Sequence, residues 1–141
     1  MTVVGRNPPE WLRQFAAGNA NLMVTGFVDD VRPYLDQAEV YVCPISDGGG
    51  TKLKILDALA MGKAIVAHPI ACEGIEVSEG ENVLYAETPE DYIDKICMLF
   101  KDASLRSSLG ASGRKLIEDK YNFVNIGKKM DRLYSGLLPP K

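Results

Sequence analysis

Three consecutive glycines, Gly48–Gly50, separate an apolar run from a run of helix-forming residues, and this junction strongly constrains the fold. Glycine adopts backbone angles that are closed to other residues, and it lets a ligand approach the main chain. The preceding run, Glu39–Pro44, is typical of a strand that is covered on both faces. The following run, Leu53–Met61, is typical of a helix that Gly62 ends. We therefore expect a strand, a glycine loop and a helix N-terminus in that order.

The N-terminus of this helix is a candidate anion site, because free N–H groups and the positive end of the helix dipole lie there. Thr51 is placed to cap the helix, and the pattern predicts one apolar stripe, made of Leu53, Leu56, Leu59 and Ala60. The alternative is a glycine turn that only brings a helix close to a sheet. The loop matches neither the Walker pattern nor Gly-x-Gly-x-x-Gly, so these motifs do not decide between the two.

Short apolar or β-branched runs alternate with helical patterns along the rest of the chain. The expected strands are 2–4, 21–26, 39–44, 63–68 and 82–86, and the expected helices are 10–17, 31–37, 53–61, 88–101, 104–120 and 122–135. This alternation predicts an α/β protein with a doubly wound parallel sheet of about five strands and a three-helix C-terminal tail. Asp29 or Asp30 should cap the second helix, Thr88 and Asp91 form a capping-box pattern, and Pro139-Pro140 should end the last helix.

Composition narrows the classes of protein. A chain of 141 residues is long enough for one domain with its own core, and nothing in it marks a domain boundary. The net charge of −3 and the dispersed basic residues argue against a nucleic-acid partner. Cys43, Cys72 and Cys97 lie far apart, which favours small buried side chains in a reducing compartment. No stretch resembles a membrane span or a signal peptide, so we expect a cytoplasmic protein.

Ligands of open parallel sheets bind at the C-terminal ends of the strands. Gly5, Gly26–Val28 and Pro44–Thr51 follow predicted strand ends, so we expect them to face one crevice. About one helical turn further on, the carboxylate of Asp57 is placed to accept hydrogen bonds from two ribose hydroxyls if it faces this crevice. The alternative is a surface ion pair between Asp57 and Lys54, three residues earlier.

Other polar and aromatic residues give weaker signals. His68 is the only histidine and has no partners at metal-ligand spacing, so we expect a structural or peripheral role. Trp11 is expected to pack in the core or in an interface rather than to form a sugar-stacking platform. Lys52 and Lys54 are either solvated surface residues or, at the rim of the loop, cations that attract phosphate.

Several of these segments together resemble the C-terminal domain of the group 1 (family 4) glycosyltransferases. The resemblance is carried by Val24–Val28, Ala38–Pro44 and Gly48–Val66, and it continues through Glu73-Gly74, Gly80–Leu84 and Tyr121–Phe123. It implies a GT-B enzyme with two Rossmann-like domains, of which the C-terminal one holds a nucleotide-diphosphate sugar of the UDP, GDP or ADP type. It also implies transfer with retention of anomeric configuration, with no cofactor and no required metal.

The resemblance assigns roles to particular residues. The Glu-x7-Glu segment of the family falls on Gly49 to Asp57. Asp57 matches the second acid, which binds the ribose hydroxyls. Gly49 matches the first acid, which lies near the donor sugar, and Asp47 is close enough in sequence to replace it. Gly50 belongs to the same expected substrate-binding loop.

The remaining positions that match the family lie on either side of this loop. Backbone N–H groups of Thr51, Lys52 and Leu53 match the diphosphate-binding positions, which agrees with the helix N-terminus expected there. Phe27 and Val28 match a loop that borders the nucleobase. No residue is assigned a catalytic role.

Relative to the family, the chain begins after a strand and a helix that bring an Arg and a Lys to the diphosphate, and it lacks the N-terminal acceptor domain. The absent strand would be central, so the five strands are expected either to rearrange or to borrow a strand in a homodimer. We expect residues 1–141 to be one partial donor-binding domain of a retaining hexosyltransferase, inactive alone. The alternatives are a nucleotide-binding module that needs a partner chain and an assembly domain without a ligand.

Overall fold

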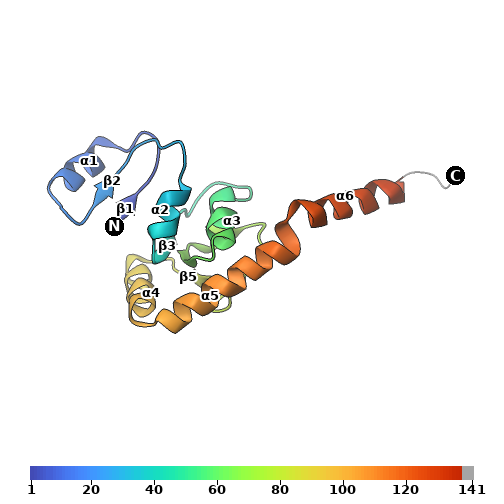
Figure 1. The fold of residues 1–141 in the computed structure, drawn as a ribbon. Coiled ribbons are helices and arrows are strands. Elements are labelled where there is room, and N and C mark those ends of the chain that lie inside the picture. Colours follow the sequence, from blue (N-terminus) through green and yellow to red (C-terminus); the bar gives the residue numbers. More distant parts are fainter. Residues whose placement is uncertain (138–141) are drawn as a thin grey trace. The chain divides into compact units, whose positions relative to one another are not determined.

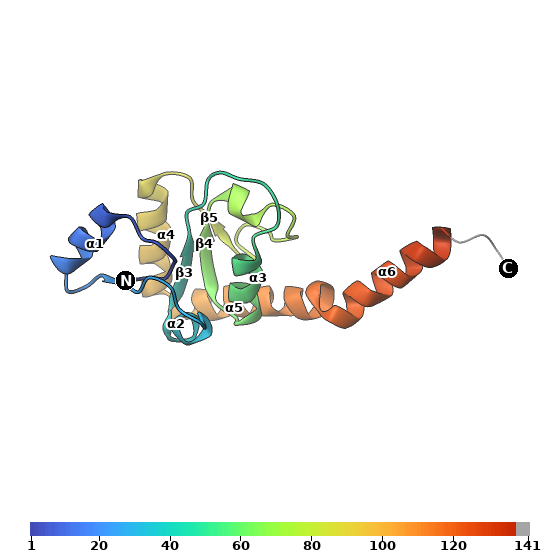
Figure 2. The same cartoon turned by 90° about the horizontal axis from the view of Figure 1, so that it is seen from above.

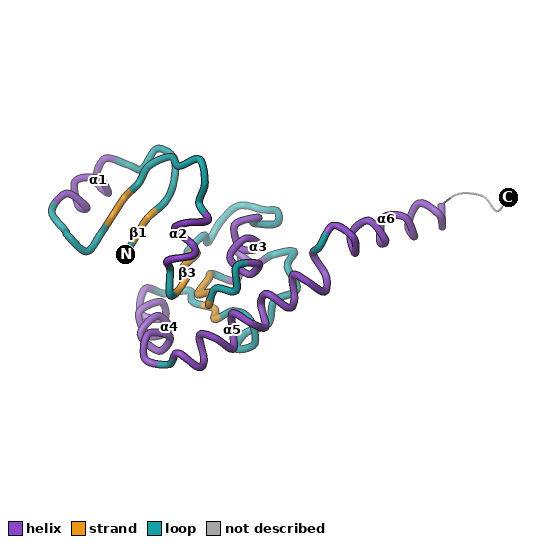
Figure 3. Tube along the Cα trace, in the orientation of Figure 1, coloured by secondary structure: helices purple, strands orange, loops and turns teal. Residues whose placement is uncertain are grey.

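The computed structural model describes residues 1–137 of the chain. These residues form two compact units, one from Met1 to Ala38 and one that begins at Glu39 (Figure 1). The elements of the first unit are β1 (Thr2–Val3), α1 (Glu10–Ala17), β2 (Met23–Val24) and α2 (Arg32–Gln37). Those of the second are β3 (Val40–Cys43), α3 (Leu53–Ala60), β4 (Ala64–Ala67), a 3-10 turn η1 (Pro69–Cys72), β5 (Leu84–Tyr85), α4 (Pro89–Lys101), α5 (Ala103–Leu116), a π-helical turn η2 (Ile117–Tyr121) and α6 (Phe123–Leu137) (Figure 3).

The first unit is built on a short parallel pair. Thr2 lies opposite Met23 and Val3 opposite Val24. A hydrogen bond of 3.2 Å from the Gly5 N–H to the Gly26 carbonyl continues the pairing beyond the strands. Helix α1 has the predicted bounds, Glu10 and Ala17.

Asp30 lies ahead of α2 but does not cap it, which corrects one prediction. The N-cap residue is Val31, and no side chain caps the helix. The Asp30 carboxylate instead accepts the Arg32 N–H at 2.9 Å and pairs with the Arg32 guanidinium at 2.9 Å. The carboxylate therefore closes a turn on Arg32, the first residue of the helix, because an Asp side chain readily accepts the backbone N–H two residues later.

The second unit contains a parallel sheet in the order β3-β4-β5, with α3 and α4 on opposite sides of it (Figure 2). Strand β4 is central and wholly buried, as expected for a strand with helices on both faces. All strand pairings in residues 1–137 are parallel, which confirms the predicted α/β class and strand number. The five strands form two separate sheets, one of two strands and one of three.

Helix α3 buries a different face from the predicted stripe. Its buried residues are Ile55, Ala58 and Leu59, whereas Leu53 is 70% exposed. The packing of Ile55 and Leu59 in the core sets the rotation of the helix, so Leu53 in the first turn points away from the core. Only Leu59 of the predicted stripe is fully buried.

Two glycines inside α5 make its close packing against α3 possible. A Cβ on Gly110 would lie 2.1 Å from the carbonyl oxygen of Gly62, which follows α3 by two residues. A Cβ on Gly113 would lie 2.7 Å from Cδ2 of Leu59. The predicted helix therefore forms despite two residues of low helix propensity, because the missing side chain of Gly110 lets main chain meet main chain and that of Gly113 leaves room for the Leu59 side chain.

Helix α4 begins with the predicted capping box. The Asp91 N–H donates to Oγ1 of Thr88 at 3.2 Å, and the Thr88 N–H donates to the Asp91 carboxylate at 3.0 Å. The apolar spacing of this helix favours Tyr92, Ile93, Ile96, Leu99 and Phe100 as its inward side chains, and of these Leu99 is fully buried whereas Ile93 and Phe100 are exposed. Residues 92, 96 and 99 define the face that packs on the sheet, and residues 93 and 100 lie on the neighbouring face.

The predicted helix 104–120 ends early as α5 and turns through η2 into α6. The hydroxyl of Tyr121 in η2 accepts the Glu76 N–H at 2.8 Å, which ties this turn to the loop before β5. Helix α6 then runs away from the sheet (Figure 1). Its large apolar side chains are exposed: Phe123, Val124, Ile126, Met130, Leu133, Tyr134 and Leu137. The predicted stop at Pro139-Pro140 lies outside the described residues.

The cysteines follow the prediction in two cases out of three. Cys43 and Cys72 are buried and free, whereas Cys97 is free but exposed, because it lies on the same outer face of α4 as Ile93. Among residues 1–137, no helix has both the length and the apolar character that a membrane crossing requires.

Candidate functional site

The candidate site is the loop that connects β3 to α3. The loop leaves the C-terminal end of β3 at Pro44 and reaches the three glycines after Asp47. Gly48 and Gly50 have φ angles of +81° and +82°, which a residue with a side chain rarely adopts, whereas Gly49 has no positive φ. Alternation of this kind gathers successive N–H groups on one side of the chain and forms an anion-binding concavity.

The N-terminus of α3 is open to a ligand. Its N-cap residue is Lys52, and no side chain caps the helix. The first backbone hydrogen bond of the helix runs from the Ile55 N–H to the Lys52 carbonyl at 2.9 Å. The N–H groups of Leu53 and Lys54 have no acceptor among the described residues. By contrast, side chains cap both α4 and α5. These free donors meet the requirement for binding an anion at a helix N-terminus.

Thr51 does not cap the helix, which corrects its predicted structural role. Its hydroxyl lies against Gly74, where a Cβ would come within 2.8 Å of Oγ1. Gly74 also has a φ of +78°, so a side chain there would be strained as well as crowded. The loop after η1 therefore packs on the glycine loop, a contact between residues 51 and 74 that the sequence pattern does not reveal.

Lys52 folds its side chain back over the loop. Its Nζ donates to the carbonyl oxygen of Gly48 at 2.8 Å and to that of Gly49 at 3.1 Å. The main chain of the loop therefore holds the ammonium group. The sequence had left two alternatives for Lys52, a solvated side chain and a cation that attracts phosphate.

Asp57 lies on α3, and its side chain is exposed. The ion pair with Lys54, one alternative for this carboxylate, is not formed in the described part of the chain. Burial, then the neighbouring Cys43, and finally the charge of Asp57 raise the pKa of Tyr41 on β3. Asp57 is therefore close enough to Tyr41 for its charge to act on the phenol. Tyr41 and Cys43 are two residues apart on β3 and therefore share one face of the strand. This spacing in the sequence could have predicted that the two side chains are neighbours.

The other predicted site residues are placed as follows. Asp47 is exposed, and its carboxylate has no hydrogen-bond or ion-pair partner among residues 1–137. Phe27 and Val28 belong to the first unit, where the Arg6 guanidinium lies 4.7 Å from the centre of the Phe27 ring. The structure therefore brings together the loop and α3 within the second unit. That Phe27 and Val28 join the same crevice stays a prediction.

His68 has the structural role expected for it. Its Nδ1 accepts the Ile70 N–H at 3.2 Å and so caps η1, while its backbone N–H donates to the Cys43 carbonyl at 3.0 Å. Trp11 is 67% exposed, so it is not part of a core in the described structure. The residues described contain no cluster of His, Cys, Asp or Glu that could hold a metal ion.

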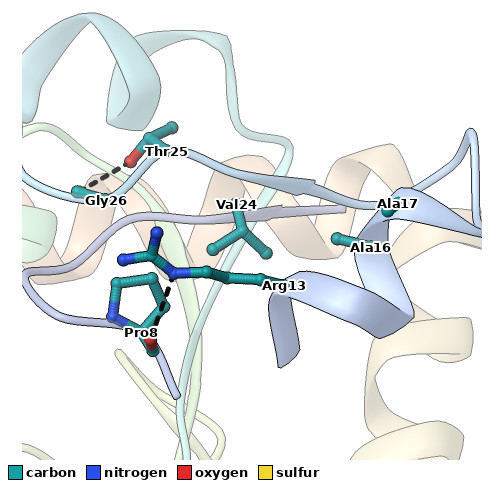
Figure 4. Close-up of a pocket in the computed structure, with 7 residues that line it drawn as sticks. All are labelled: Pro8, Arg13, Ala16, Ala17, Val24, Thr25 and Gly26. Atoms are coloured by element: carbon teal, nitrogen blue, oxygen red, sulfur yellow. Dashed lines mark hydrogen bonds between the residues drawn. The ribbon is translucent and has the colours of Figure 1, made fainter. Parts of the chain in front are cut away.

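A cavity of about 380 Å³ lies in the first unit between α1 and the end of β2 (Figure 4). Its lining residues are Pro8, Arg13, Ala16, Ala17, Val24, Thr25 and Gly26. The Nε of Arg13 donates to the Pro8 carbonyl at 3.3 Å. The cavity contains no predicted substrate-binding residue, although Gly26 was expected at the crevice.

Comparison with known proteins identifies the family. A family model described as glycosyl transferases group 1 matches residues 1–102, which is more than half of the chain. The chain belongs to the group 1 glycosyl transferases. An uncharacterised glycosyltransferase of Methanocaldococcus jannaschii is 27% identical over 124 residues, covering 85% of this chain and 32% of the relative. The capsular polysaccharide biosynthesis glycosyltransferase CapM of Staphylococcus aureus is 25% identical over 126 residues, covering 88% and 33%. The chain spans about a third of the length of these relatives.

Solved structures share the fold of this group 1 member. HepE of Anabaena in complex with UDP superposes with a TM-score of 0.83 at 17% identity, covering 96% of this chain and 40% of that chain. The C-terminal domain of a group 1 glycosyl transferase from Francisella tularensis gives a TM-score of 0.69 at 24% identity, covering 81% and 60%. These likenesses confirm the Rossmann-like α/β arrangement of a GT-B domain.

Proposed function

We propose that the chain binds the nucleotide-diphosphate sugar donor of a glycosyl transfer reaction, with the diphosphate on the glycine loop and the N-terminus of α3. The observation that carries the proposal is the uncapped start of α3, where the N–H groups of Leu53 and Lys54 have no protein acceptor among the described residues. A diphosphate oxygen would satisfy these donors and interact favourably with the helix dipole.

Asp57 supplies the second element of the proposed site. Its exposed carboxylate forms no ion pair among the described residues. A carboxylate accepts hydrogen bonds from two adjacent hydroxyls, which is how acidic residues bind a ribose. The family membership of the chain and the UDP bound to HepE support this assignment.

Sugar transfer requires charge stabilisation on the departing diphosphate. Lys52 lies beside the loop, and its ammonium is occupied by two carbonyl groups. We therefore expect donor binding without detectable transfer by the 141-residue chain. Detection of transferred sugar by mass spectrometry, with a panel of simple acceptors, would contradict this expectation.

The direct test is a two-dimensional amide NMR titration of the chain with UDP, GDP and ADP. The proposal predicts saturable shifts at Gly48–Leu53 for at least one nucleotide. Asp57→Asn should weaken binding about tenfold to a hundredfold, because a hydrogen bond to a charged group is worth about 1.5–3 kcal/mol. The matched control is Asp94→Asn on the exposed surface of α4, which should leave the affinity unchanged.

Three outcomes contradict the proposal. The first is a folded chain that shows no saturable shift with any of the nucleotides. The second is a set of shifts that avoids the glycine loop. The third is equal affinity in the Asp57→Asn and Asp94→Asn variants, which would remove Asp57 from the site.

A further inference from the structure

We propose that Lys52 is a positioning residue, whose ammonium group fixes the glycine loop in the conformation that presents its N–H groups to the donor diphosphate. This inference rests on the proposed function for the identity of the ligand. The bracing of the loop itself is a property of the free protein. It can therefore be tested separately.

The contacts of Lys52 define the brace. Its Nζ reaches back to two consecutive carbonyl groups, at 2.8 Å from Gly48 and 3.1 Å from Gly49. A Cβ on Gly48 would lie 3.7 Å from the same Nζ, so the ammonium lies close against the main chain. Hydrogen bonds from an ammonium group are charge-assisted and stronger than those between neutral groups.

The orientation of the peptide groups follows from these contacts. The chain contains no cis peptide among the described residues, so each peptide carbonyl points opposite to the N–H of the next residue. The carbonyl of Gly48 shares a peptide group with the N–H of Gly49, and the carbonyl of Gly49 shares one with the N–H of Gly50. Because Lys52 holds both carbonyl groups, the two N–H groups point away from the ammonium.

A glycine loop without the brace would lack this order. Glycine has the largest backbone freedom of any residue, and three in a row would sample many conformations. The two peptide groups that Lys52 holds lie between Gly48 and Gly50, the two loop residues with positive φ. Their N–H groups are therefore the ones that such an alternation of φ gathers on one side of the chain. Lys54, two residues later, is exposed and forms no hydrogen bond or ion pair in the described structure, so it has the same charge without the brace.

The alternative is that Lys52 contacts the phosphate directly. The two roles differ in their dependence on salt, because salt screens the attraction between an ammonium group and a diphosphate strongly, whereas it weakens a short contact between the ammonium and uncharged carbonyl groups much less. They also differ in the free protein, where only the brace affects the loop.

The first experiment measures the free chain by NMR, using amide 15N relaxation of Gly49 and Gly50 and the carbonyl 13C shifts of Gly48 and Gly49. In Lys52→Met, we expect the amide order parameters to fall from about 0.85 towards 0.6 and the carbonyl shifts to move. Lys52→Arg keeps a charged donor and should restore both, and Lys54→Met should change neither. Unchanged order parameters in a folded Lys52→Met chain would overturn the proposal.

The second experiment titrates UDP into the same variants at low and high salt. Lys52→Met should lose roughly fivefold to tenfold in affinity, the size of one or two ordinary hydrogen bonds, and this factor should persist at high salt. A loss that disappears at high salt would overturn the brace in favour of a direct charge contact. If the wild-type chain binds no nucleotide, the proposed function fails, while the free-protein measurement still decides whether Lys52 orders the loop.

Discussion

Replacing Gly110 by alanine should destabilise the second unit, although the same change in an exposed helix is stabilising. The added Cβ would lie 2.1 Å from the carbonyl oxygen and 2.9 Å from the carbonyl carbon of Gly62. Non-bonded heavy atoms in a packed interior lie about 3.5 Å apart, so α5 and the end of α3 must separate by about 1 Å or more. Both obstructing atoms belong to the main chain, so no side chain can turn aside.

The expected loss can be worked out from opposing terms. Insertion of one methyl group into a packed contact costs about 1–3 kcal/mol, and a main-chain obstacle favours the upper part of this range. Alanine returns about 1 kcal/mol in helix propensity. We therefore expect a net loss of about 1–2 kcal/mol, or a fall in unfolding temperature of about 4–15 °C for a unit of this size.

Urea unfolding followed by circular dichroism measures this loss. The matched control is Gly127→Ala in α6, where an added Cβ meets no atom within 4 Å, so this variant should not lower the unfolding midpoint. If Gly110→Ala unfolds at the same urea concentration as the wild type or at a higher one, the backbone contact between α5 and Gly62 is not formed in solution.

The cysteines and the cap of α4 give further predictions. Iodoacetamide should modify Cys97 in the native chain and should reach Cys43 and Cys72 only after unfolding. Labelling of Cys43 or Cys72 in the native chain, detected by mass spectrometry, would contradict this prediction. Burial, and then the charge of Cys43, raises the pKa of Cys72 from 9.0 to about 11, so stability should fall as pH rises across this interval and fall less in Cys72→Ala. Hydrogen bonds from Thr88 and from the Glu87 N–H hold the pKa of Asp91 below its usual value, so the cap should stabilise the fold at neutral pH and lose this effect as acid protonates the carboxylate. Asp91→Asn should therefore show a smaller change in unfolding temperature between about pH 2 and 6, and equal acid sensitivity would contradict the role of the cap.

The parts of the fold that local chemistry determines could be predicted from sequence. Helix α1, with a proline before it and a glycine after it, has the predicted bounds, and the Thr88–Asp91 capping box forms as expected. The parallel strands follow from their alternation with helices. The buried face of α3 could not be predicted from its leucines, because the packing of Ile55 and Leu59 against the folded core sets the rotation of the helix. The separation into two sheets likewise depends on pairing between distant strands.

The candidate site divides in the same way. The glycine loop and the start of α3 are adjacent in sequence, so their junction could be recognised from composition and spacing. The hydrogen bonds of Lys52 and the contact of Thr51 with Gly74 depend on how side chains settle over the folded main chain. A pattern of residue types does not contain that information, since Lys52 and Lys54 look equivalent in sequence.

Helix α6 has a consequence for the helix–coil equilibrium of the chain. A helix gains most of its stability from the packing of its apolar face, and one of about 15 residues is marginal in water without it. The described residues of α6 bury none of their large apolar side chains. Its helical state therefore depends on weak intrinsic propensities, further lowered by Gly127 and Gly136, and on the η2 turn that starts it. The helix content of this segment should consequently rise when another surface covers its apolar face.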